Sequence, residues 1–114
     1  MHSRRAIDEA KKGSAEVVIL AIVEREAQHG YQISKLIELR TGGSLTFTLA
    51  SLYATLYRLE DRGWIASFWG TSENNRKAKY YRLTPAGRKQ LASQTARWEQ
   101  VVRAIGRILN PATE

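Results

Sequence analysis

The sequence predicts one mainly α-helical domain with a small β-hairpin, an α+β fold class. Apolar residues recur at helical spacing in three segments and run almost without a break in a fourth. One further segment alternates and is rich in aromatic and β-branched residues, which is typical of a strand. Glycine, proline and threonine stand at the boundaries between these segments. The length of 114 residues fits a single compact domain.

The chain begins with residues 1–12, which are polar and weakly patterned, and we expect an N-terminal arm that is either a short helix or a basic extension. Ser14 is a candidate N-cap for the apolar run 15–23, and Glu16 suits the positive end of a helix. The run is apolar on nearly every side, which predicts a mostly buried helix. Its β-branched residues leave a buried strand as the alternative, although the polar stretch 24–28 favours a helix.

A second helix is expected after the break at residues 29–31. Ile33, Leu36 and Ile37 then recur at the i, i+3, i+4 spacing of a helix with one buried stripe. The stretch 41–43 ends it, because its two glycines can adopt the left-handed conformation of a helix cap. His29, directly before a glycine, is interpreted as a structural residue.

A third helix is predicted between Thr48, a suitable N-cap, and Gly63, which ends it. Its core-facing stripe is expected to consist of four leucines, Leu49, Leu52, Leu56 and Leu59. Residues 64–69 then read as a strand and residues 79–83 as the strand that returns beside it. The tip of this hairpin would carry Asn74, Asn75, Arg76 and Lys77.

The last helix is predicted to begin with Thr84 as N-cap and Pro85 at its first position, and to run to Leu109. The order helix, helix, helix, hairpin, helix predicts a winged helix-turn-helix. We therefore expect a DNA-binding domain over residues 13–84, a C-terminal dimerisation helix over residues 85–109 and a tail over residues 110–114.

The formal net charge of +7 is concentrated in one part of the sequence. Residues 74–89 hold six cations and no acid, whereas 12 cations and 11 anions nearly cancel elsewhere. Such a basic segment is typical of a protein that binds a polyanion, although a solvated surface remains the alternative.

The third helix and the hairpin supply the candidate DNA contacts. The helix is expected to expose small and hydroxyl-bearing side chains that approach bases or phosphates, with Tyr53 at the edge of this face. The candidates on the helix are Thr48, Ser51, Tyr53, Ala54, Thr55, Tyr57 and Arg58, and those on the wing are Arg76, Lys77 and Lys79. Tyr80 and Tyr81 must face opposite sides of a strand. One should pack on the helices with Trp64 or Phe68 and the other should lie on the outer face, and alternation does not decide which.

The last helix carries a long apolar stripe at helical spacing, formed by Leu91, Trp98, Val101, Val102, Ile105, Ile108 and Leu109. A stripe of this length predicts a homodimer interface, and the alternative is that it folds back on the first helix. A homodimer would place two recognition helices on a palindromic operator.

Catalytic and metal-binding functions find no support in the sequence. His2 and His29 are far apart, the chain has no cysteine, and the adjacent acids Glu60 and Asp61 are interpreted as a solvated helix end. We expect no enzyme, metal or cofactor. The sequence contains no run of about 18 apolar residues, so no transmembrane helix is expected. Residues 1–12 are charged and lack the apolar core of a signal peptide. A cytoplasmic location without membrane contact is expected.

Four segments resemble the PadR family of bacterial transcriptional regulators, and the resemblance extends over about residues 12–92. They are K-G-S (12–14), H-G-Y-Q-I (29–33), S-L-Y-x-x-L-x-R-L-E-x-x-G-W-I (51–65) and K-Y-Y-x-L-T-x-x-G (79–87). The stretch E-N-N-R-K-A-K (73–79) is similar to one branch of the family. The chain looks like the short class, which has a single C-terminal helix.

The resemblance implies a winged-helix repressor that binds its operator as a homodimer, with dimerisation through the C-terminal helix. It implies that Ser51, Tyr53 and Arg58 lie on the DNA-reading helix and that the wing cations hold the backbone. Some short-class members bind flat aromatic or drug-like effectors between protomers, so Trp98 either lines such a pocket or serves packing. Ala54 and Thr55 depart from the family pattern, which bears on the operator sequence. The alternative function is a protein–protein adaptor that does not bind specific DNA.

Overall fold

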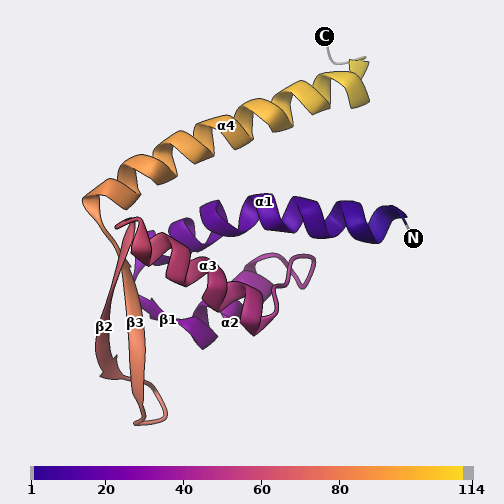
Figure 1. Cartoon of the computed structure of the whole chain (residues 1–114). Helices are drawn as coiled ribbons and strands as arrows, with labels where there is room; N and C mark the ends of the chain where they lie inside the picture. The colour runs from indigo at the N-terminus through magenta and orange to yellow at the C-terminus, as the bar shows by residue number, and fades with distance from the viewer. Residues whose placement is uncertain (1, 112–114) are drawn as a thin grey trace.

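The computed structural model describes the backbone of residues 2–111 and the side chains of residues 14–111. It is mostly helical with one small antiparallel sheet, so the predicted fold class is confirmed (Figure 1). In chain order the elements are α1 (His2–Arg25), β1 (Gln28–His29), α2 (Gly30–Arg40), α3 (Leu49–Asp61), β2 (Ile65–Thr71), β3 (Lys77–Leu83) and α4 (Pro85–Leu109).

Helix α1 is continuous from His2 to Arg25, so the interpretation of Ser14 as an N-cap is wrong. Residues 2–12 contain several good helix formers and no proline, which lets the helix extend through Gly13. The expected helix over the apolar run is confirmed, which excludes the strand alternative. The run is also buried as expected, since Ile19 and Leu20 are completely buried.

Helix α2 begins where β1 ends. The His29 side chain caps it, because its Nδ1 accepts a hydrogen bond from the backbone N–H of Gln32 at 3.3 Å. The structural interpretation of His29 is therefore confirmed. The helix ends as expected at Thr41, and both Gly42 and Gly43 have positive φ angles, 61° and 82°.

Helix α3 has the expected N-cap, since Thr48 Oγ1 accepts from the backbone N–H of Ser51 at 3.1 Å. The predicted core stripe is correct for three of its four leucines. Leu49 is 48% exposed because it starts the helix beyond the edge of the core. The fourth buried position is Thr55, which completes the i, i+3, i+4, i+7 spacing that begins at Leu52.

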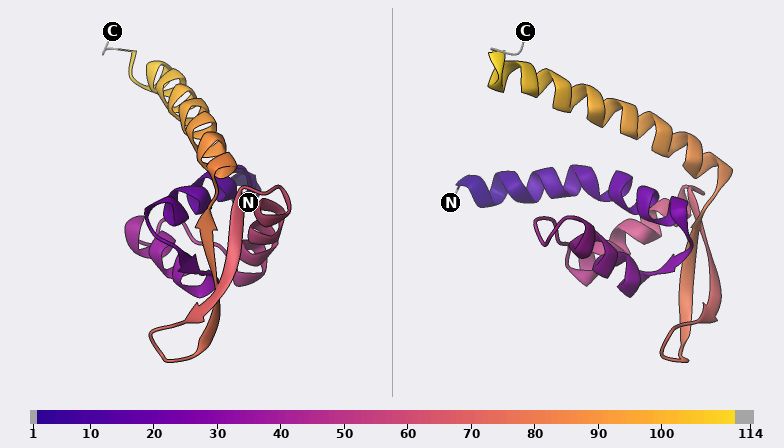
Figure 2. Two further views of the ribbon diagram at one scale, coloured as in Figure 1. Left: turned by 90° about the vertical axis from the view of Figure 1, so that its left-hand side faces the viewer. Right: turned by 180° about the vertical axis from the view of Figure 1, so that it is seen from behind.

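The sheet has the strand order β1-β3-β2, and both pairs are antiparallel. The predicted hairpin is confirmed, with Ile65 opposite Leu83 at its base and Thr71 opposite Lys77 near its tip. It projects past the helices as a wing (Figures 1 and 2). Strand β1 was not predicted, because two residues are too short to establish an alternating pattern.

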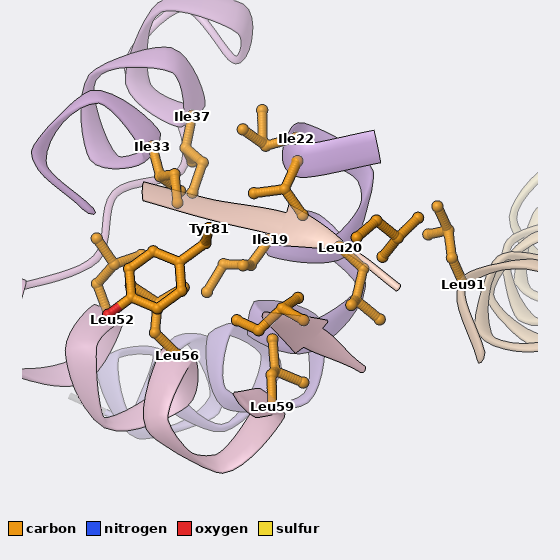
Figure 3. Close-up of a cluster of buried hydrophobic side chains, with 13 residues drawn as sticks. Ile19, Leu20, Ile22, Ile33, Ile37, Leu52, Leu56, Leu59, Tyr81 and Leu91 are labelled. Carbon is orange, nitrogen blue, oxygen red and sulfur yellow. The ribbon is translucent and has the colours of Figure 1, made fainter. Parts of the chain in front are cut away.

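The two adjacent tyrosines of β3 have different surroundings. Tyr81 is buried in the core beside Leu52 and Leu56 (Figure 3), and burial raises its pKa to about 12. Tyr80 lies on the other face of the sheet, where its ring stacks on Phe68 at a centroid distance of 5.6 Å. Of the two suggested neighbours of the packed tyrosine, Trp64 is confirmed at the core, whereas Phe68 shares the outer face with Tyr80.

Helix α4 starts and ends where the sequence predicted. Thr84 Oγ1 accepts from the backbone N–H of Gly87 at 3.0 Å and donates to the carbonyl oxygen of Gly63 at 2.6 Å. Gly87 lies so close to the sheet that a Cβ atom there would be 1.9 Å from the carbonyl oxygen of Trp64. The first turns pack against α1 through Leu91, and the rest of the helix extends away from the body of the protein (Figure 2).

Candidate nucleic-acid interface

The outer face of α3 is mostly as predicted. Ser51, Ala54, Tyr57 and Arg58 are exposed. The expectation that Thr55 lies on this face is wrong, because its side chain is only 2% exposed. Burial of its hydroxyl is tolerated because Oγ1 donates to the carbonyl oxygen of Ser51 at 3.0 Å and accepts from Nη2 of Arg58 at 3.2 Å. Thr55 therefore contributes by holding the Arg58 guanidinium against the helix.

Two tyrosines form the edge of this face. Tyr53 is half-buried against the start of α2, where a Cβ atom added to Gly30 would lie 2.5 Å from the Tyr53 hydroxyl oxygen. The ring of Tyr57 lies 6.2 Å from that of Tyr53 and is 57% exposed. The close approach at Gly30 lets α2 and α3 meet, and it leaves Tyr57 as the more accessible aromatic side chain of the face.

Glu60 connects α3 to the wing. One of its carboxylate oxygens accepts a hydrogen bond from Oγ of Ser67 on β2 at 2.5 Å, and the other lies 3.6 Å from Nζ of Lys79 on β3. The interpretation of Glu60 as part of a solvated helix end is therefore wrong, whereas Asp61 is exposed as expected. Both strands of the wing are thus held to the end of α3 by one side chain.

The wing tip carries the cations that the sequence predicted there. Residues 72–76 form the turn, with Asn75 at a φ of 58° and Arg76 exposed. Lys77 is also exposed, and its Nζ lies 5.1 Å from the centroid of the Trp69 ring. Trp69 is 63% exposed on the wing, although it is not among the predicted interface residues. Strand alternation could have identified it, because Trp69 lies on the same face of β2 as the core residue Ile65.

The basic segment of the sequence does not form a single patch in space. Arg76, Lys77 and Lys79 belong to the wing surface beside α3. Arg82 follows Tyr80 on the opposite face of β3, and Arg88 on α4 forms an ion pair with Glu24 of α1 at 3.4 Å. The candidate interface therefore holds three of the six cations, although all six lie close together in the sequence.

The predicted dimer stripe divides into two parts. Leu91 is buried in the core of its own protomer, so its assignment to a surface that a partner covers is wrong. Its other members are exposed in the protomer: Trp98, Val101, Val102, Ile105, Ile108 and Leu109. Trp98 lies between two open hollows of about 330 and 350 Å³, one lined also by Glu16 and the other by Val17 of α1.

Other kinds of site find little support. Within the described residues no cluster of histidine and acidic side chains is suited to a metal ion. None of the helices in this part of the chain is long and apolar enough to cross a membrane.

Comparisons with known proteins identify the family. A model of the transcriptional regulator PadR-like family matches residues 19–93. An uncharacterized protein of Lysinibacillus sphaericus is 33% identical over 94 residues, which are 82% of this chain and 86% of that protein. A transcriptional regulator from Clostridium thermocellum has a TM-score of 0.78 at 30% identity, with 87% of this chain and 93% of that chain covered.

A PadR-like transcriptional regulator from Bacillus cereus is similar in the same way, with a TM-score of 0.75 at 28% identity and coverage of 86% of this chain and 93% of that chain. Members of the PadR-like family regulate transcription, which confirms the expectation that the chain is not an enzyme. Since the family model spans both the helix-turn-helix and the wing described above, the chain belongs to the PadR-like family of transcriptional regulators.

Proposed function

We propose that this protein is a transcriptional repressor that binds a palindromic operator in the bacterial cytoplasm as a homodimer. Helix α3 would lie in the major groove, and the wing would follow the phosphate backbone or enter the adjacent minor groove. The observation that carries the proposal is the continuity of one surface: the exposed polar face of α3 leads through Lys79 to the cations of the wing tip.

Each part of this surface suits a different feature of DNA. Ser51 and Ala54 are small, so they allow the helix backbone to approach base edges closely. Arg58, held by Thr55, can donate two hydrogen bonds to a guanine or pair with a phosphate. Arg76 and Lys77 are free of ion pairs among the described residues, which leaves their charge available for phosphates.

The exposed half of α4 supports the homodimer. Val102, Ile105 and Ile108 are at least half exposed in the protomer, and aliphatic side chains in such a row are stabilised when a second copy covers them. A twofold axis through this helix would relate two recognition surfaces, which matches the symmetry of a palindromic operator.

Release by a small aromatic or drug-like effector is also part of the proposal. Trp98 supplies a large flat side chain between two hollows, and Glu16 and Arg97 place polar groups at one of them. An effector bound beside Trp98 would contact both α1 and α4, and could alter how they pack.

The proposal is tested by fluorescence anisotropy of the purified protein with labelled DNA from directly upstream of its own gene. A random duplex of equal length is measured in parallel at three salt concentrations. We expect nanomolar binding to the upstream DNA, about 10³-fold tighter than to the random duplex. Absence of binding to either duplex at low salt would refute DNA binding and favour a protein–protein adaptor.

A further inference from the structure

We propose that Trp69 is a DNA-contacting residue of the wing. Its indole would pack on the deoxyribose of the backbone while Lys77 and Lys79, on either side of it, pair with neighbouring phosphates. This inference rests on the DNA-binding function proposed above and adds to it an aromatic contact that the charges of the wing do not imply.

The position of Trp69 follows from the register of the hairpin. Ile65, Ser67 and Trp69 alternate along β2, so their side chains lie on the same face of the sheet. Ile65 is buried in the core on this face, and Ser67 donates to Glu60 at the end of α3. Trp69 is the next side chain outward, and it therefore lies where the wing extends beyond the recognition helix.

Cationic and aromatic side chains alternate along the surface that contains Trp69. Lys79 is its cross-strand partner, and Nζ of Lys79 lies 6.0 Å from the ring centroid of Tyr57 on α3. Lys77, two residues further toward the tip, places its Nζ 5.1 Å from the indole. Tyr57, Lys79, Trp69 and Lys77 thus form a row of alternating aromatic and cationic side chains that joins the exposed face of α3 to the wing tip.

The chemistry of this row suits a sugar–phosphate backbone. A backbone offers anionic oxygens at regular intervals with apolar sugar faces between them, and the row offers cations with an aromatic ring between them. The indole N–H is in addition a donor for a phosphate oxygen. Charge complementarity and continuity with α3 therefore select the DNA backbone as the partner of this exposed ring.

The opposite face of the same strand provides a matched control. Phe68, 42% exposed, stacks on Tyr80, whose ring also meets the imidazole of His29 edge-on at 5.3 Å. Phe68 and Trp69 are both exposed aromatic side chains in the middle of β2, and they lie on opposite sides of the sheet. Only Trp69 shares its side with Lys77, Lys79 and the end of α3.

The test measures binding of Trp69→Ala, Trp69→Phe and Phe68→Ala to a random duplex and to the upstream duplex across a salt series. We expect Trp69→Ala to bind both duplexes about ten-fold more weakly. Its salt dependence should equal that of the wild type, because no charge is removed. Trp69→Phe should recover most of the affinity, and Phe68→Ala should bind as the wild type does. Thermal unfolding by circular dichroism confirms that each variant is folded.

A second readout uses the tryptophan emission of the protein. DNA should change the emission of the wild type, and this change should be largely lost in Trp69→Phe. Wild-type binding together with unaltered binding by Trp69→Ala would overturn the contact and leave the proposed function intact. Failure of the wild type to bind any duplex would overturn both.

Discussion

The protein exposes two surfaces that are built in opposite ways. On the surface formed by α3 and the wing, contacts within the protomer hold the side chains: Arg58 bonds to the buried Thr55, Lys79 pairs with Glu60, and Lys77 lies over Trp69. On the outer half of α4, Ile108 and Leu109 are 80% and 71% exposed aliphatic side chains. The first surface is arranged within one protomer, whereas the second leaves apolar area in water.

This difference indicates how each surface is stabilised. Hydrogen bonds and an ion pair hold the polar surface in shape before any partner arrives, which reduces the cost of ordering side chains on binding. The apolar stripe has no such internal support, and in the proposed homodimer a second copy would bury it. Substitutions should therefore affect the two surfaces through different measurements.

The largest effect is expected where the wing and α4 meet, since both surfaces depend on this junction. Gly87→Ala places a Cβ atom 1.9 Å from the carbonyl oxygen of Trp64, so the backbone must move. We expect a loss of at least about 2 kcal/mol in the free energy of unfolding, measured by urea denaturation. The same substitution at Gly106, where a Cβ atom meets nothing in the protomer, should gain up to about 1 kcal/mol from helix propensity. Equal effects at the two glycines would refute the tight junction.

The next effect concerns the apolar stripe. Ile105→Asp puts a charge among the aliphatic side chains of α4, and we expect homodimer association to weaken by at least about 100-fold. Sedimentation equilibrium measures the change. Gln100→Asp adds an equal charge to the other side of the same helix and should leave the dimer intact. A dimer that tolerates Ile105→Asp would show that another surface joins the protomers.

The polar surface is tested by the double variant Arg76→Ala/Lys77→Ala. Loss of two phosphate contacts should weaken binding to every DNA sequence and reduce the slope of log K against log salt by about 2. Arg82→Ala serves as the control, because Arg82 lies on the other face of β3. Anisotropy titrations at several salt concentrations provide the slopes, and an unchanged slope in the double variant would remove the wing from the interface.

The smallest effect is expected at the link between helix and wing. Glu60→Gln keeps an acceptor for Ser67 but removes the negative charge beside Lys79. Stability should change by less than about 1 kcal/mol, because the ion pair is partly exposed. Affinity for random duplex should rise slightly, because Lys79 no longer has to exchange Glu60 for a phosphate. Weaker binding by this variant would instead show that the ion pair orients the wing.

The sequence was most informative where structure depends on neighbouring residues. Thr48 and Thr84 were identified as N-caps because a cap is formed by residues three apart in the chain. The hairpin was identified because alternation along its strands is local. The end of α4 at Leu109 followed from Asn110 and the proline after it.

Predictions failed where distant residues decide the outcome. Thr55 is the exception: its polarity suggests the surface, although it occupies a buried position in the local spacing of Leu52, Leu56 and Leu59. Nothing within α3 predicts the partner of Glu60, because the Ser67 that donates to it lies on another element. The six clustered cations separated because β3 alternates its side chains and α4 then turns back toward α1.

Helix α4 is attached to the rest of the protein at one end, so a small tilt at its base gives a larger displacement at its far end. Its base is fixed by the bond from Thr84 to the carbonyl oxygen of Gly63 and by the close seat of Gly87, and its far half leaves the body. A helix of 25 residues is about 37 Å long, so a tilt of about 10° at its base would displace its far end by about 6 Å. That distance approaches two base-pair steps of DNA. In a dimer joined through these far ends, a small change of packing between α1 and α4 would be magnified into a shift between half-sites.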